Sequence, residues 1–113
     1  MRYCDILAFL RPNPKTTMTY VVHAYDYTDP EALGRRMAAR PDHLAGTLTL
    51  REAGQYILGG ALLDADGQMI GSLMVLDFET EADLLAWQAA EPYIQRGVWE
   101  KIDIKLFRQA NVQ

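Results

Sequence analysis

Four polar residues in the first half of the chain are spaced so that they share one side of a helix. They follow one another at intervals of 4, 3 and 4 residues: Arg36, Arg40, His43 and Thr47. A neutral imidazole is the form that acts as a general base, and cationic neighbours favour that form where no acid lies close. His43 is therefore a candidate general base, against the plainer interpretation of a helical histidine that packs or lies partly exposed. Arg36 and Arg40 are candidates for binding a carboxylate or phenolate. The plainer interpretation is that both are solvated surface charges.

The second candidate for chemistry is an acid at the end of a later helix. Glu91 comes directly before Pro92, and proline keeps the preceding residue out of the right-handed helical conformation. An extended backbone at this point can direct the Glu91 carboxylate towards a neighbouring element. The plainer alternative is a helix stop followed by an ordinary surface acid, and spacing alone does not separate the two.

Several other chemistries are disfavoured by composition. Ser72 is the single serine, and it lacks the surroundings of a hydrolase nucleophile. The two histidines and Cys4 have no metal-ligand spacing, so we expect no metal. Gly59 and Gly60 lie in a predicted strand rather than in a phosphate-binding loop, and they mark either a bulge or a close approach to the backbone. We therefore expect no cofactor.

The candidate histidine lies on a predicted helix that contains a proline. Residues 19–25 form a strand of β-branched and aromatic residues, and the helix follows with Asp29 as its N-cap. Because Pro41 removes a backbone hydrogen bond, we expect either one kinked helix or two short helices, over 30–39 and 42–53. Apolar residues at spacings of 4, 7 and 4 predict the face that packs on the core: Leu33, Met37, Leu44 and Leu48.

The second half of the chain supplies three strands and a helix. Strands 56–63 and 68–78 join through a glycine-containing turn, a helix follows Thr80 and stops near Pro92, and strand 99–108 comes last. The order βαββαβ predicts an α+β fold of the ferredoxin-like type, a four-stranded antiparallel sheet with both helices on one face. One strand, 68–78, is apolar on both faces, whereas one helix layer covers a single face. We therefore expect a homodimer in which a second copy covers the open face.

Length and composition describe one small domain. The chain has 113 residues, a net charge of −4 and no apolar run near the roughly 20 residues that span a bilayer. Acidic domains repel phosphate backbones, so nucleic acid is a poor partner, and a single cysteine favours the reducing cytoplasm. Residues 18–108 are the predicted domain and 109–113 a tail. The turn-rich stretch 1–17 is a flexible arm, a segment upstream of a natural start at Met18, or an arm that packs on a partner subunit.

The order of several short motifs resembles the YCII-related family over about Met18 to Arg108. The motifs are Arg40-Pro-x-His43-Leu44, Gly59-Gly60, Gly71-Ser72, Trp87, Glu91-Pro-Tyr93, Gly97-Val-Trp99 and Lys105-x-Phe107. The resemblance implies a dimeric α+β barrel in which two four-stranded sheets face each other. It also implies an active site built on a histidine–aspartate pair, which falls on His43 and Glu91. Because glutamate replaces the usual aspartate, either the pair keeps its contact with a shifted geometry or the activity has changed or been lost.

The resemblance gives these residues an expected function. Relatives in this family and fold include a dehydrochlorinase of a substituted hydroquinone, muconolactone isomerases and cofactor-free monooxygenases. We therefore expect a lyase or isomerase in which His43 and Glu91 transfer protons on a small cyclic or aromatic substrate. The expected substrate-binding residues are Arg36, Arg40, Gly60, Ser72 and Tyr93. The alternatives are a ligand-binding or accessory module without catalysis, and a structural dimer whose cleft is incidental.

Overall fold

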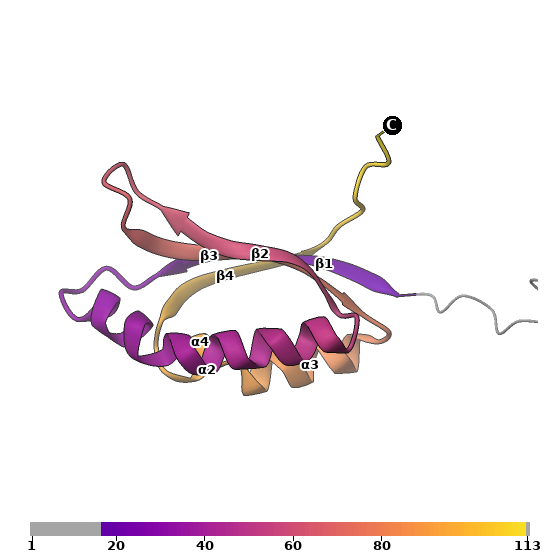
Figure 1. The fold of residues 1–113 in the computed structure, drawn as a ribbon, viewed down its shortest axis with the longest axis horizontal. Coiled ribbons are helices and arrows are strands. Elements are labelled where there is room, and N and C mark those ends of the chain that lie inside the picture. Colours follow the sequence, from indigo (N-terminus) through magenta and orange to yellow (C-terminus); the bar gives the residue numbers. More distant parts are fainter. Residues whose placement is uncertain (1–16, 113) are drawn as a thin grey trace, which may run out of the picture.

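The computed structural model describes residues 17–112 as one sheet with a helical layer on one face (Figure 1). In chain order, the elements are β1 (Met18–Asp26), α2 (Ala32–Glu52), β2 (Tyr56–Leu63), β3 (Met69–Phe78), α3 (Glu81–Ala90), α4 (Pro92–Gln95) and β4 (Trp99–Leu106). The predicted arm lies outside the described residues except for Thr17. None of the helices in the described part is long and apolar enough to cross a membrane.

The sheet is antiparallel throughout, and its strands lie in the order β2-β3-β1-β4. Alternate side chains of the two central strands, from Tyr20 to Asp26 in β1 and from Ser72 to Phe78 in β3, point to the helical layer and are buried, as the period of a strand requires. These side chains and those of the covering layer form the core: Tyr20, Val22, Ala24, Ala39, Leu50, Met74, Leu76, Phe78, Leu84, Tyr93, Val98 and Trp99. The predicted ferredoxin-like α+β fold is confirmed.

α2 is one helix of 21 residues that continues through Pro41, so of the two expected arrangements the two short helices are wrong and the single helix is found. Proline removes one hydrogen bond from the helix, but Ala39 and His43 are buried on either side of it, and this packing holds the helix together. Figure 1 shows the first turns of α2 inclined to the rest of the helix. The helix also begins two residues later than expected, because Glu31 rather than Asp29 is the N-cap.

Asp29 instead fixes the turn before α2 through an ion pair. Its carboxylate accepts hydrogen bonds from both Nη atoms of Arg35 at 2.8 Å, and from the backbone N–H of Glu31 at 3.2 Å. Arg35 also donates from Nε to the carbonyl oxygen of Gly97 at 3.0 Å. The hydrogen bonds from Arg35 lower the pKa of the Asp29 carboxyl to about 2, so the pair stays charged near neutral pH. The start of α2 is thereby tied to the segment that precedes β4.

The apolar stripe on α2 is exposed, so the prediction that it packs on the core is wrong. Its four side chains are between 39% and 54% exposed: Leu33, Met37, Leu44 and Leu48. The helix buries a different face, which contains Ala32, Arg36, Ala39, His43 and Leu50. Charged and polar side chains can be buried where partners satisfy them, and Arg36 and His43 both contact buried acids. The helix is therefore turned so that its candidate functional residues face the sheet.

The face of the sheet that lies away from the helices is apolar at its centre. Val75 of β3 is 4% exposed although no described element covers it, because Val21 of β1 and Leu58 of β2 flank it in register. Leu73 is half-buried on the same face. β3 thus presents apolar side chains on both faces, as its sequence predicted.

Candidate active site

His43 and Glu91 meet in the helical layer, although they lie 48 residues apart in the sequence. The Nδ1 atom of His43 contacts the Oε1 atom of Glu91, and the two residues are 8% and 4% exposed. Glu91 lies between α3 and α4 with φ −68° and ψ 120°, the extended conformation that Pro92 favours. Its carboxylate points back to α2 because the two helices are broken at this residue.

This contact determines which imidazole nitrogen of His43 carries the proton and which one has a free lone pair. A carboxylate accepts hydrogen bonds, so Glu91 fixes the proton of neutral His43 on Nδ1 and leaves a lone pair on Nε2. The ring stacks on Tyr93 with 4.0 Å between centroids and 11° between planes. The edge of Trp99 packs against it at 6.2 Å and 74°. His43 is thus held in one orientation by an acid and two aromatic rings.

A second buried network lies beside the first. Arg36 donates from Nη1 to both oxygens of Asp26 at 2.9 and 3.0 Å, and from Nη2 to Oγ of Ser72 at 2.9 Å. Trp99 donates from Nε1 to the same Ser72 oxygen at 3.1 Å. Burial raises the pKa of the Asp26 carboxyl, and Arg36 opposes this shift by its charge and its hydrogen bonds. The Arg36 guanidinium lies 4.7 Å from the centre of the Tyr93 ring, so Tyr93 contacts both networks.

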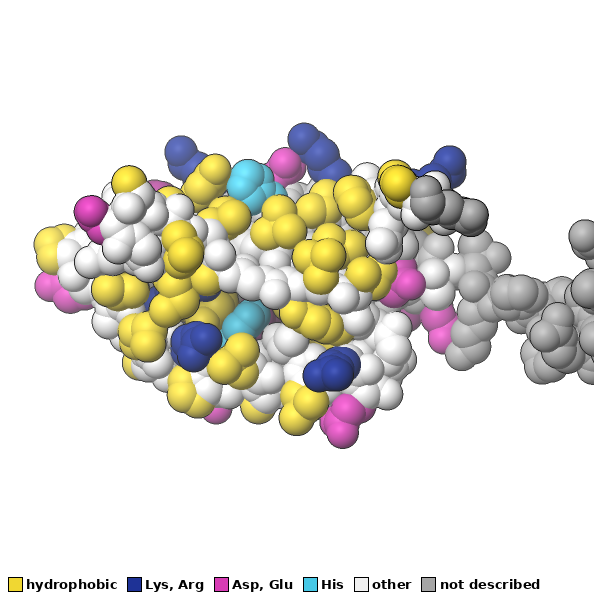
Figure 2. Space-filling view, turned by 45° about the horizontal axis from the view of Figure 1, so that its top comes forward, with side chains coloured by type: hydrophobic (Ala, Val, Ile, Leu, Met, Phe, Trp, Pro, Cys, Tyr) yellow, Lys and Arg dark blue, Asp and Glu magenta, His cyan; other side chains and the backbone are white. Residues whose placement is uncertain are grey.

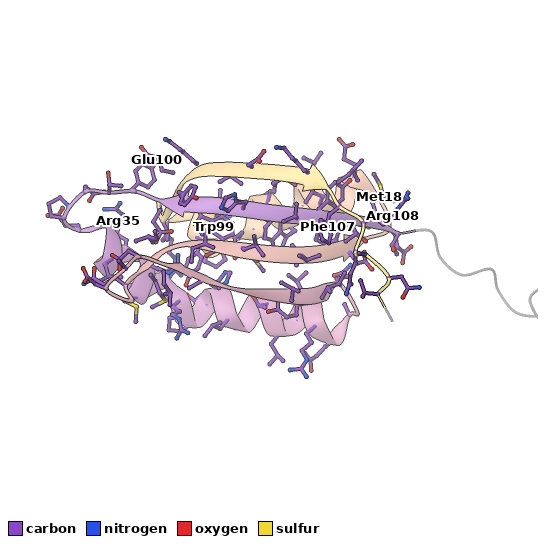
Figure 3. All side chains as sticks on the ribbon, turned by 90° about the horizontal axis from the view of Figure 1, so that it is seen from above. Met18, Arg35, Trp99, Glu100, Phe107 and Arg108 are labelled. Atoms are coloured by element: carbon purple, nitrogen blue, oxygen red, sulfur yellow. The ribbon has the colours of Figure 1, made fainter. Side chains whose placement is uncertain are left out.

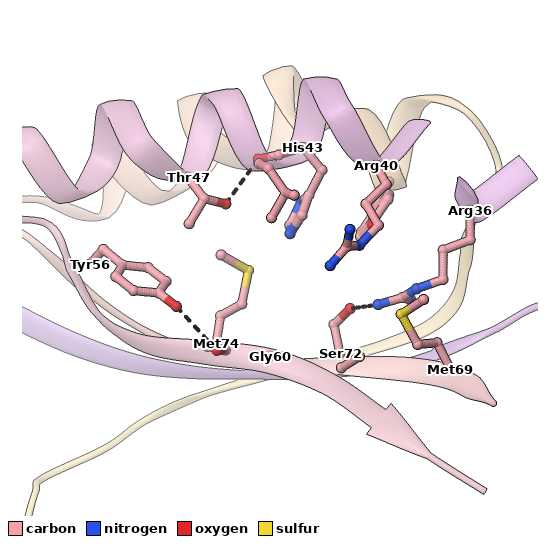
Figure 4. A pocket seen from close by; sticks show the side chains of 13 residues that line it. Arg36, Arg40, His43, Thr47, Tyr56, Gly60, Met69, Ser72 and Met74 are labelled. Carbon is pink, nitrogen blue, oxygen red and sulfur yellow. Dashed lines mark hydrogen bonds between the residues drawn. The ribbon is translucent and has the colours of Figure 1, made fainter. Parts of the chain in front are cut away.

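The two networks border one pocket of about 90 Å³ between α2 and the strands β2 and β3 (Figure 4). All five expected substrate-binding residues line it, together with His43: Arg36, Arg40, Gly60, Ser72 and Tyr93. Glu91 is not in the lining and contacts the opposite side of the imidazole. In Figure 2, a histidine lies in a hollow with a basic side chain and several apolar ones around it. Arg40 is exposed and has no acidic partner within residues 17–112.

The two glycines on β2 differ in the space around them. A Cβ atom on Gly59 would lie 3.0 Å from the hydroxyl of Tyr56, which donates to the Gly59 carbonyl at 3.1 Å. A Cβ atom on Gly60 would meet nothing within 4 Å. Gly59 therefore permits the close approach that the sequence suggested, and the approaching group is the Tyr56 side chain at the rim of the pocket.

Two residues of the site were not predicted. Asp26 lies just beyond the strand expected over residues 19–25, yet it ends β1 on the buried face of Tyr20, Val22 and Ala24. The alternation of these side chains could have placed it there and marked it as an acid that needs a buried partner. No feature of the sequence indicated that Trp99 would donate a hydrogen bond to Ser72. Figure 3 shows Trp99 and Arg35 towards one end of the sheet and Met18, Phe107 and Arg108 at the other, so the site lies at the end away from the start of β1.

Known proteins are similar to this chain in sequence and in fold. The model of the YCII-related domain matches residues 18–108. Protein YciI of Escherichia coli O6:H1 is 32% identical over 98 residues, which cover 81% of this chain and 98% of that protein. An uncharacterized protein of Haemophilus influenzae is 30% identical over the same share of both chains.

Two solved structures share the fold at low sequence identity. The 5-chloro-2-hydroxyhydroquinone dehydrochlorinase TftG of Burkholderia phenoliruptrix AC1100, in complex with 2,5-dihydroxybenzoquinone, has a TM-score of 0.72 and is 20% identical. The match covers 82% of this chain and 96% of TftG. A protein of Bacteroides thetaiotaomicron described as an antibiotic biosynthesis monooxygenase has a TM-score of 0.53 and is 12% identical, with 83% and 90% covered. The family match spans most of the chain, and the chain therefore belongs to the YCII-related domain family.

Proposed function

We propose that this chain is an enzyme in which His43 acts as the general base and Glu91 orients it. The observation that carries the proposal is the buried contact between Nδ1 of His43 and Oε1 of Glu91, made by a histidine that lines a pocket. This contact leaves the Nε2 lone pair free to take a proton from a substrate. The carboxylate then stabilises the imidazolium ion that forms. The reactions that this arrangement serves are proton transfer, isomerisation and elimination.

The proposed substrate is a small cyclic or aromatic compound that carries an anionic or acidic oxygen. An apolar cavity that holds benzene has a volume of about 150 Å³, so a pocket of about 90 Å³ takes in part of one ring. Arg40 lines the pocket without an acidic partner among the described residues, and a guanidinium suits a carboxylate or phenolate. The dehydrochlorinase TftG binds an oxygenated ring, 2,5-dihydroxybenzoquinone, on the same fold. We extend this ligand class to the present chain as part of the proposal.

The test is a turnover assay against lactones and halogenated hydroquinones. We expect the chain to convert at least one member of the panel, followed by absorbance and by chloride release. His43→Ala is expected to lower that rate by about 100-fold or more, since general acid–base catalysis contributes at least that much. A variant that keeps the wild-type rate would refute the role of His43. Binding of a panel member without any turnover would favour the non-catalytic ligand-binding module.

We further propose that the enzyme is a cytoplasmic homodimer that pairs through the open face of the sheet. Val21 and Leu73 are half-buried beside the buried Val75 on this face, and a second sheet would remove their exposed surface from water. The single cysteine is compatible with the cytoplasm.

Sedimentation at micromolar concentration tests the dimer. We expect the wild-type chain to sediment with twice the mass of one chain, and Leu73→Glu to sediment as a folded monomer because the dimer would have to bury its charge. Leu85→Glu changes an exposed leucine of α3 in the helical layer and is expected to remain dimeric. A wild-type monomer, or a dimeric Leu73→Glu variant, would contradict the proposal.

A further inference from the structure

The hydroxyl of Ser72 has one hydrogen bond left to make, and it can only donate it. A serine hydroxyl accepts two hydrogen bonds and donates one. Its oxygen already lies 2.9 Å from Nη2 of Arg36 and 3.1 Å from Nε1 of Trp99. Guanidinium and indole nitrogens only donate, so Ser72 must accept from both. Both lone pairs are occupied, and the hydroxyl hydrogen is directed elsewhere.

The described residues offer that hydrogen no acceptor. Ser72 is 2% exposed, and the hydrogen bonds of its hydroxyl within residues 17–112 are the two that it accepts. Its neighbours in the sheet are Ala24 on β1 and Ala61 on β2, whose side chains have no polar atom. Ser72 lines the pocket, and Figure 4 shows it on the strand side, across from His43 and Arg40 of α2. A buried donor in this position is satisfied when a ligand presents an oxygen to it.

Other groups around the pocket also donate. The Nε atom of Arg36 is buried without a hydrogen-bond partner in the described part of the chain. Burial raises the pKa of the Tyr93 phenol, against the opposing charges of Arg36 and Arg40, so it stays protonated and can donate at neutral pH. Arg40 adds a cation with no acid beside it within residues 17–112. A pocket lined by these donors and by one basic nitrogen selects a ligand that is rich in oxygen acceptors.

We infer that Ser72 binds the oxygen on which negative charge develops when His43 takes a proton from the substrate. The inference rests on the proposed function and names the substrate class, a cyclic carbonyl compound with a proton on the carbon next to the carbonyl group. The proton moves from that carbon to Nε2 of His43. The electrons of the C–H bond form the carbon–carbon double bond of an enolate, and the carbonyl π electrons move to the oxygen. The enolate oxygen accepts the Ser72 hydrogen bond, which Arg36 strengthens by donating to the same hydroxyl.

A phenolate reproduces this oxygen in a stable molecule, so 4-nitrophenolate binding to the intact chain tests the inference directly. Nitrobenzene has the same ring without the charged oxygen and is the matched neutral probe. We expect the wild-type chain to bind 4-nitrophenolate, and Ser72→Ala to bind it about 10- to 100-fold more weakly, the loss expected for a hydrogen bond to a charged group. Nitrobenzene affinity is expected to change by less than about twofold, because a purely structural role of Ser72 would weaken both probes alike.

Two further variants keep the test decisive. Ser72→Cys retains a weak acceptor for Arg36 and Trp99, so this variant should fold. Because a thiol is a poorer donor than a hydroxyl, we expect its affinity for 4-nitrophenolate to be at least about fivefold lower than that of the wild type. Thr47→Val removes another hydroxyl near the pocket, but Thr47 already donates to the His43 carbonyl at 2.9 Å, so less than about a twofold change is expected.

The possible outcomes separate this inference from the proposed function. Failure of the wild-type chain to bind 4-nitrophenolate, or equal affinity of wild type and Ser72→Cys, would overturn the inference. Equal losses for 4-nitrophenolate and nitrobenzene would also overturn it. Selective loss of 4-nitrophenolate binding in the Ser72 variants would support the contact of Ser72 with the charged oxygen. If His43→Ala then had no effect on turnover, the part of the inference that names His43 as the base would fail together with the proposed function.

Discussion

Glu91→Gln is expected to lower the rate of the proposed reaction by about 10³- to 10⁴-fold while the domain remains folded. The two side chains have the same shape, so the packing around residue 91 is preserved. A glutamine can donate its amide N–H to Nδ1 of His43, which would place the imidazole proton on Nε2 and remove the basic lone pair from the pocket. It also cannot stabilise an imidazolium ion by its charge. The measurement is the turnover rate on the substrate found in the panel, with the free energy of unfolding determined alongside.

Glu91→Asp is the matched control, because it keeps the charge and shortens the side chain by one methylene group. The backbone at residue 91 is extended before Pro92 and can direct either acid towards α2. We expect Glu91→Asp to retain far more activity than Glu91→Gln, since it preserves the tautomer of His43. If the Gln variant turned over substrate as fast as the wild type, the acid would have no part in catalysis.

Gly71→Ala is expected to destabilise the domain by about 3 kcal/mol, at the upper end of what overpacking costs. A Cβ atom on Gly71 would lie 2.3 Å from the carbonyl oxygen of Ala24 and 3.1 Å from a methyl group of Leu62. The first of these is backbone at the centre of the sheet, so it cannot move aside without breaking the pairing of β1 and β3. The loss is a large fraction of the 5 to 15 kcal/mol that stabilises a typical domain. Denaturant unfolding, with the slope compared between variants, measures it.

Gly46→Ala makes the same chemical change on α2, where a Cβ atom would meet nothing within 4 Å. Alanine is the better helix former, so this variant is expected to stabilise the domain by about 0.5 to 1 kcal/mol. Opposite signs for the two substitutions would show that contact, rather than the loss of glycine, decides the effect. A Gly71→Ala variant as stable as the wild type would contradict the close approach of β1 and β3.

The order of the elements was predictable because strands and helices differ in local pattern. The strand patterns, the capping threonine before α3 and the glutamate before Pro92 are features of neighbouring residues, and they predicted the sheet and the end of α3. The short helix α4 after Pro92 was not predicted. The polar stripe of Arg36 and His43 was also visible at helical spacing.

The orientation of α2 was not predictable from that helix alone. Periodicity assumes that apolar side chains face inward, whereas this helix buries Arg36 and His43 and exposes a stripe that includes Leu44. The reason lies in partners at distant positions. Asp26 is 10 residues from Arg36, and Glu91 is 48 residues from His43, and both acids are buried. The family resemblance had already paired His43 with Glu91, whereas the contact of Arg36 with Asp26 is seen only in the folded chain.

The residues that hold the pocket's His43, Arg36 and Ser72 in place come from segments that leave the ribosome at very different times. Asp26 is synthesised early, Glu91 late, and Trp99, whose indole completes the hydrogen bonds of Ser72, begins the final strand. A growing polypeptide that lacks β4 therefore has no Trp99 ring to pack against the His43 imidazole. It also lacks the indole N–H that donates to Ser72. The proposed chemistry therefore requires nearly the whole domain to have been made, so turnover by the proposed enzyme would report on complete folding.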